Sequence, residues 1–148
     1  MLFRSQVNLW LRHCRGVVVT GNSFATAYER SVVLEHCRHV VIGTNTFDHN
    51  PDYTGDRIDG IRIVGSAGVN LQNLILEGCR AGGPDEGGAI EVVDSSEVLI
   101  LGCQVLDPKF RGIDIRNCRN TKVSECQVVD RRARPTMRDL IHIVGSDQ

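Results

Sequence analysis

Apolar and polar residues alternate along most of the chain in short bursts. In Leu9–Leu11, Val32–Leu34 and Ile61–Ile63, for example, apolar residues return at every second position. A period of two predicts a β-strand that buries one of its faces. Val and Ile dominate these bursts, which favours strand over helix. We therefore expect an all-β chain.

The bursts belong to copies of one repeated unit. The segments Leu9–Arg15, Val32–Arg38 and Ile113–Arg119 share an apolar alternation that ends in His-Cys-Arg or Asn-Cys-Arg, and weaker copies lie between and after them. A small residue marks the same position in every copy, at steps of 23, 29, 29, 23 and 28 residues: Cys14, Cys37, Ser66, Ser95, Cys118 and Ser146. Such a period indicates a repeat protein.

Three bursts per copy, with like residues in the same column, predict the coil of a parallel β-helix. Length differences between copies fall after the third burst, at residues 48–59, 77–88 and 129–139, and loops of this kind often form the binding side of a solenoid. A leucine-rich repeat needs a helical segment, and a left-handed β-helix needs a six-residue period; neither pattern occurs. We expect about five to six coils of three strands each, as one domain over residues 1–148 or as part of a longer helix.

Two segments resemble a known family. Val17–Phe24 and Ile42–Phe47 are similar to the second-turn segment of right-handed parallel β-helices in the pectate-lyase-like and polygalacturonase-like superfamily. The resemblance implies a right-handed coil and an asparagine ladder at Asn22 and Asn45. Asparagine suits such a position because it tolerates a left-handed turn and passes amide hydrogen bonds along a stack.

The catalytic motifs of that superfamily are not intact. The polygalacturonase motifs do not occur, and the pectate-lyase pattern Arg-x-Pro-x-x-Arg has Ala133 in place of its first Arg. Asp107-Pro108 keeps half of the Asp-Pro-His-Glu of alginate epimerases. The resemblance is therefore to a fold and names no substrate.

The six cysteines fit the repeat better than a metal or disulfide framework. One inward column holds Cys14, Cys37 and Cys118, a second holds Cys103 and Cys126, and Cys79 begins a loop. We expect buried free thiols, which favour a cytoplasmic location. A Cys14–Cys37 bridge stays open, because adjacent rungs lie about 4.8 Å apart. His13 and His36 should stack as exposed side chains, since strand neighbours point apart and each His-Cys pair cannot chelate.

The resemblance implies that ligands bind on the outward face of the first sheet, beside the long loops. The outward positions there are Trp10, Val33, Arg62, Glu91, Asp114 and His142, and three residues earlier come Asp59, Gly88, Arg111 and Asp139. Alternation places their side chains toward solvent. We predict a site for acidic or neutral polysaccharide, with substrate-binding residues Asp59, Arg62, Arg111 and Asp139.

An enzymatic alternative uses the same face. Glu91 and Asp114 lie on neighbouring rungs, so their carboxyls can approach about 5 Å, as in retaining glycosidases. His142 can act as acid or base, and Arg62 can hold a uronate or sulfate. Glu91, Asp114 and His142 would then be the catalytic residues of a glycosidase, lyase or epimerase. No cofactor is expected, although the carboxylates could hold Ca²⁺.

A structural or assembly module without a ligand is a third interpretation. In that case Arg62–Glu91 and Asp114–His142 are ordinary cross-strand pairs.

Charge and hydropathy exclude several classes. The net charge of the chain is −1. Residues 48–94 carry a net charge of −6 and residues 109–138 one of +6, so these two segments cancel. This balance excludes a globally basic nucleic-acid binder, and the basic loop 131–138 has no aromatic residue to stack bases. No apolar run reaches the roughly 20 residues of a membrane span. Residues 1–16 lack the apolar core of a signal peptide, so we expect none.

The ends of a β-helix need protection, because open coils expose strand edges and core. Residues 1–6 are too few for a capping helix, and Phe3 fits the last inward position of a preceding coil. After Ile141–Ile143 the pattern stops, which leaves Val123 and Val128 partly uncovered. We expect either further coils in a longer protein or a homodimer, closed by two-fold symmetry, through the C-terminal end.

Overall fold

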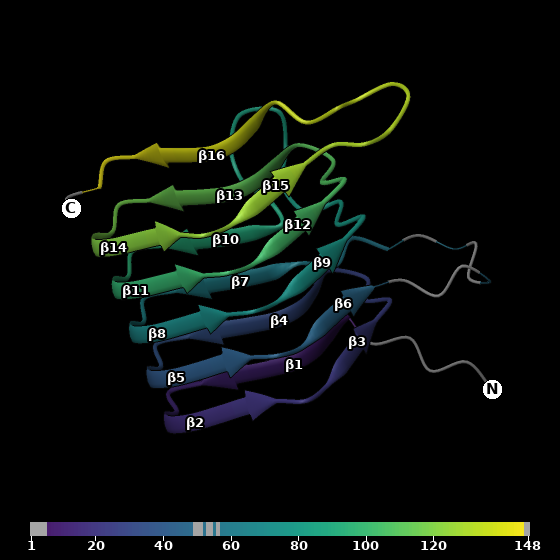
Figure 1. Ribbon diagram of the computed structural model, residues 1–148. Helices are drawn as coiled ribbons and strands as arrows, with labels where there is room; N and C mark the ends of the chain where they lie inside the picture. Colours follow the sequence, from purple (N-terminus) through teal and green to yellow (C-terminus); the bar gives the residue numbers. More distant parts are fainter. Residues whose placement is uncertain (1–5, 49–51, 53–54, 56, 147–148) are drawn as a thin grey trace.

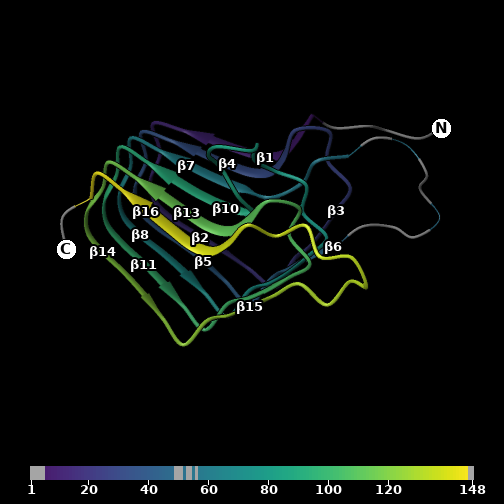
Figure 2. The same cartoon turned by 90° about the horizontal axis from the view of Figure 1, so that it is seen from above.

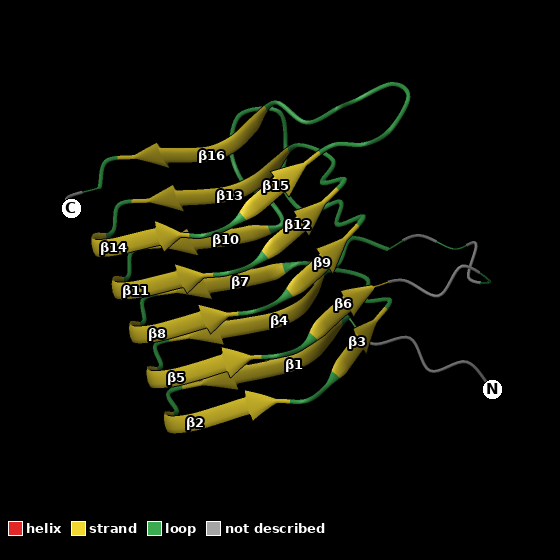
Figure 3. Cartoon of the chain, in the orientation of Figure 1, coloured by secondary structure: helices red, strands yellow, loops and turns green. Residues whose placement is uncertain are grey.

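The computed structural model describes residues 6–48, 52, 55 and 57–146, and these residues form strands and connections without a helix (Figure 3). Six strands form the first sheet: β1 (Val7–Arg12), β4 (Arg30–Glu35), β7 (Ile61–Val64), β10 (Ile90–Val93), β13 (Arg111–Arg116) and β16 (Asp139–Val144). The second sheet contains β2 (Arg15–Thr20), β5 (Arg38–Gly43), β8 (Ala67–Gln72), β11 (Ser96–Leu101) and β14 (Arg119–Ser124). The third contains β3 (Ser23–Ala25), β6 (Thr46–Asp48), β9 (Ile75–Glu77), β12 (Gln104–Leu106) and β15 (Gln127–Val129).

Consecutive strands pass from one sheet to the next, so that every third strand lies beside its equivalent (Figure 1). All pairings are parallel, and Ile61, Ile90 and Ile113 occupy equivalent positions on successive rungs. Viewed along the stack, the strands of each sheet lie over one another (Figure 2). Five complete coils and a sixth first-sheet strand therefore form a parallel β-helix, as the repeat predicted.

Stacked aliphatic side chains fill the interior. Leu34, Ile63, Val92 and Ile115 stand in register on neighbouring rungs and are fully buried. Phe24 and Phe47 stack with ring centroids 4.9 Å apart. The inward columns read from the sequence are thus the core of the molecule.

The asparagine ladder is present, but its geometry differs from the expectation. Asn45 accepts the Asn22 backbone N–H at 2.8 Å and donates its amide to the Val19 carbonyl at 3.1 Å. In each turn the left-handed backbone belongs to the residue before the asparagine: Gly21 at φ +74° and Thr44 at φ +55°. Asparagine is therefore selected here for its amide, which satisfies two backbone groups of the preceding coil, rather than for a left-handed backbone.

Small residues in the turn between the first-sheet and second-sheet strands connect successive coils. Ser66 Oγ accepts the Cys37 backbone N–H at 3.1 Å and donates to its own coil at Val64, also at 3.1 Å. All six cysteines are free thiols, so Cys14 and Cys37 form no bridge. Burial raises the pKa of Cys79 to about 12, which keeps this thiol protonated and unreactive. His13 and His36 stack as exposed rings, as expected.

The last coil is the more open end of the described chain. Its strand β16 exposes large apolar side chains at Leu140, Ile141, Ile143 and Val144. Beneath it, Val123 and Val128 are only half-buried, as the sequence indicated. The expectation for Phe3 falls outside the described residues. Among those residues, nothing forms a helix that is long and apolar enough to span a bilayer.

This apolar edge gives a first testable prediction. The wild-type protein should sediment as a dimer at micromolar concentration, because pairing through β16 would cover these side chains and its unpaired edge. Leu140→Lys should shift the population to monomer, since it places a charge in the contact. Val18→Lys, at the opposite end of the stack and also exposed to solvent, is the matched control. A monomeric wild type would contradict the prediction.

Candidate functional site

The outward row of the first sheet is in register along all six strands, but its members differ in exposure. Trp10 pairs with Val33, Val33 pairs with Arg62, and the row continues from Arg62 through Glu91 and Asp114 to His142. Trp10 is 54% exposed, whereas Glu91 is 5% and Asp114 is 0% exposed. The expectation that the outward row faces solvent is therefore wrong for both carboxylates and also for Val33, which is 7% exposed.

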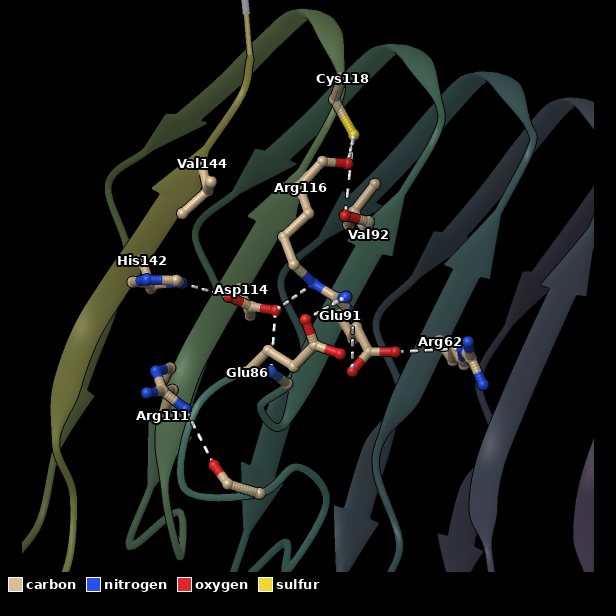
Figure 4. A network of polar contacts seen from close by, with 12 residues as sticks. Arg62, Glu86, Glu91, Val92, Arg111, Asp114, Arg116, Cys118, His142 and Val144 are labelled. Atoms are coloured by element: carbon tan, nitrogen blue, oxygen red, sulfur yellow. Dashed lines mark hydrogen bonds and ion pairs between the residues drawn. The ribbon is translucent and has the colours of Figure 1, made fainter.

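The carboxylates are buried because residues 78–89, here called the cover loop, fold over coils four and five (Figure 4). Arg111 donates to the Gly83 and Pro84 carbonyls, each at 2.9 Å. The Gly87 backbone N–H donates to Asp114 at 2.9 Å. Gly87 has φ +91°, and a Cβ there would lie 2.7 Å from Glu91 Oε2, so only glycine allows this close approach.

Beneath the cover loop lies a network of alternating charges. Asp114 accepts from Arg116 Nε at 2.8 Å, and its other oxygen lies 2.6 Å from His142 Nδ1. Glu91 pairs with Arg62 at 3.0 Å and with Arg116 at 3.4 Å. The cross-strand pairs Arg62–Glu91 and Asp114–His142, which a module without a ligand would form, are thus present.

Arg116 is the centre of this network. Burial by itself would lower the pKa of Arg116, but the carboxylates of Glu91, Asp114 and Glu86 outweigh burial and raise it. Arg116 also reaches Glu86 of the cover loop at 2.9 Å. Its guanidinium therefore joins the loop to both buried carboxylates and stays charged.

The predicted substrate-binding residues separate into three places. Arg62 lies at the edge of the network, with a side chain that is 47% exposed. Arg111 is buried and pairs with Asp139 at 2.9 Å. Asp59 lies in the connection before β7, where it pairs with Arg57 and accepts the Ala27 backbone N–H at 2.6 Å. Of the four predicted substrate-binding residues, only Arg62 stands in the outward row itself.

A groove of about 1320 Å³ lies on the same face over coils one to three. Trp10, Val33 and Arg62 form its floor. Residues of the connections before β4 and β7, including Tyr28 and Ile58, line its side. Trp10 and Val33 lie on the face that the alternation predicted for them, but the sequence indicated no role for either residue.

Charged residues in the groove are held by local contacts. Glu35 pairs with Arg12 at 3.1 Å, and the Arg12 guanidinium lies 5.4 Å from the centre of the Trp10 ring. Arg30 donates to the Glu29 carbonyl at 2.8 Å, and burial lowers its pKa. Arg30 was not among the residues predicted from the sequence, although it stands three residues before Val33, as Arg111 stands before Asp114.

No group of three or more His, Cys, Asp or Glu side chains is placed to hold a metal ion within residues 6–48, 52, 55 and 57–146. Ca²⁺ binding thus stays an expectation from the sequence.

The model of one protein family, described as a right-handed β-helix region, matches residues 7–146. A search of curated proteins finds no match to this chain. The family match covers all the described strands and agrees with the hand that the sequence resemblance implied.

Proposed function

Since the chain belongs to the right-handed β-helix family, whose fold hosts its sites on surface rows and loops, we propose that it binds polysaccharide in the groove over coils one to three. The fold alone carries no function, so the proposal rests on the groove.

The observation that carries it is the exposed indole of Trp10 on the groove floor. A sugar ring has an apolar C–H face and a rim of hydroxyls, so it suits an aromatic surface flanked by polar groups. Tyr28 on the side and Arg62 at the end of the floor supply such groups. The groove also exceeds the roughly 300–1,000 Å³ of small-molecule pockets, which favours a polymer.

The polar groups of the groove favour hydroxyls and sugar acids alike. Glu35 and Arg62 are each held by an opposite charge, which fixes their geometry before a ligand arrives. Preformed polar groups lose little conformational entropy on binding. Both acidic and neutral polysaccharides are therefore candidate ligands.

Binding suits this face better than catalysis. Glu91 and Asp114 are buried and paired with Arg62 and Arg116, and the Gly87 N–H also occupies Asp114. Catalysis by these carboxylates would require the cover loop to leave them and the pairs to break. The Trp10 groove needs no such rearrangement.

Trp10→Ala should weaken polysaccharide binding about tenfold or more, the loss expected when one stacking aromatic is removed. Folding should change little, because more than half of the indole is exposed. A glycan array followed by calorimetry on the strongest ligand measures the loss.

Val18→Ala is the control, since Val18 is exposed on the second sheet and lies outside the groove. If the wild type binds no acidic or neutral glycan, the proposal is wrong. If wild type and Trp10→Ala bind with equal affinity, the binding site does not include Trp10.

A further inference from the structure

We infer that the groove receives the end of a polysaccharide chain rather than an internal segment. This inference rests on the proposed function and specifies which part of the polymer is recognised.

The groove is closed on one side by the fold itself. Along the outward row, Arg62 is the last residue that lines the groove. The next position is Glu91, which is buried beneath Gly87 of the cover loop. A polymer lying over Trp10 and Val33 therefore meets the loop at coil four and cannot continue along the stack.

The obstruction is firmly attached to the sheet. Arg111 donates to two carbonyls of the cover loop, and Arg116 pairs with Glu86 (Figure 4). Arg138 donates to the Pro84 carbonyl at 2.9 Å. Within the loop, Gly83 N–H donates to the Glu86 carbonyl at 2.8 Å. Gly82 packs so tightly on Gly87 that a Cβ would lie 2.6 Å from the Gly87 carbonyl. These contacts, from both sides of the loop, oppose its displacement by a ligand.

The side of the groove directs the polymer toward this obstruction. Tyr28 and Ile58 come from two successive connections and border the floor along the stack. A chain guided along this border would place its terminal sugar beside Arg62. The Arg62 side chain is 47% exposed and can donate to the hydroxyl that a terminal sugar carries and an internal sugar lacks.

A length series tests the inference with the wild-type protein. The probes are short, intermediate and long cello-oligosaccharides, as a neutral series, and oligogalacturonides, as an acidic series. Calorimetry should give one protein per chain at every length, and an affinity per mole of chains that stops rising once the groove is filled. Chains with a chemically reduced end distinguish the reducing from the non-reducing terminus: loss of binding assigns the former, retention the latter.

The outcomes separate the two proposals. If the number of proteins bound per chain grows with length, the inference is overturned while the proposed function stands. If neither series binds, both fail for these polymers.

A loop variant provides a second test. Deleting residues 83–86 should let long chains pass, so that several proteins bind each chain. The double substitution Pro84→Ala and Asp85→Ala, at the exposed loop tip, should leave one protein per chain. Circular dichroism reports whether the deletion variant folds, and the wild-type length series decides the inference without it.

Discussion

Asp114→Ala should lower the free energy of unfolding by about 3–5 kcal/mol, the usual cost of removing one partner of a buried ion pair. The fully buried carboxylate accepts from Arg116 and Gly87 and contacts His142. Its loss would leave the Nε–H of Arg116 and the backbone N–H of Gly87 without an acceptor beneath the cover loop. The sequence alone suggested the opposite, because it placed this side chain in solvent.

Urea unfolding followed by circular dichroism measures the effect, and Asp94→Asn is the control, because asparagine tolerates the left-handed backbone of Asp94 at φ +50° and alanine does not. Asp94 is an exposed carboxylate in the turn after β10 that bonds Asn117 at the surface. Such exposed contacts contribute only about 0–1 kcal/mol. Equal shifts for the two variants would mean that the network does not stabilise the fold.

Phe47→Ala should be comparably damaging, at about 3–5 kcal/mol, since it removes the largest fully buried side chain and leaves a cavity. Phe47 packs between Phe24 and Leu76 in the third-sheet column. Neighbouring coils are fixed by their own strand pairing, so they cannot collapse to fill the space.

Phe24→Ala supplies the comparison for Phe47→Ala. Phe24 stacks on Phe47 but is only half-buried in the first coil, so its removal should cost distinctly less. The same urea experiment applies to both variants. A larger effect at Phe24 would show that the interior columns are not closed where the structure places them.

The fold could be predicted from the sequence because the chain is built of repeats. An inward residue such as Ile63 is recognisable because its equivalents Leu34, Val92 and Ile115 recur at one column of every copy. Pairing of like positions then determines register across all three sheets. The outward row from Trp10 to His142 followed from the same alternation.

The site was harder to predict because it depends on segments outside the repeat. Whether Glu91 faces solvent is decided by the cover loop, which lies after the third burst, where the sequence differs from copy to copy, and whose course depends on Gly82 and Gly87. Tyr28 likewise belongs to a connection, where alternation gives no direction. The sequence therefore located the face, but not the division between an open groove and a buried network.

The order of strands in each sheet has a consequence for how the molecule responds to perturbation. Each strand pairs only with its equivalents in the coil before and the coil after, as in a one-dimensional array with nearest-neighbour coupling, and the cover loop adds a link between coils three and five. Phe47 in coil two and Asp114 in coil five are separated by two intervening coils, so the effects of their substitutions should add. Local opening at one end need not propagate to the other. Ligand in the groove should therefore suppress hydrogen exchange in the first three coils and leave β16 fraying at its own rate.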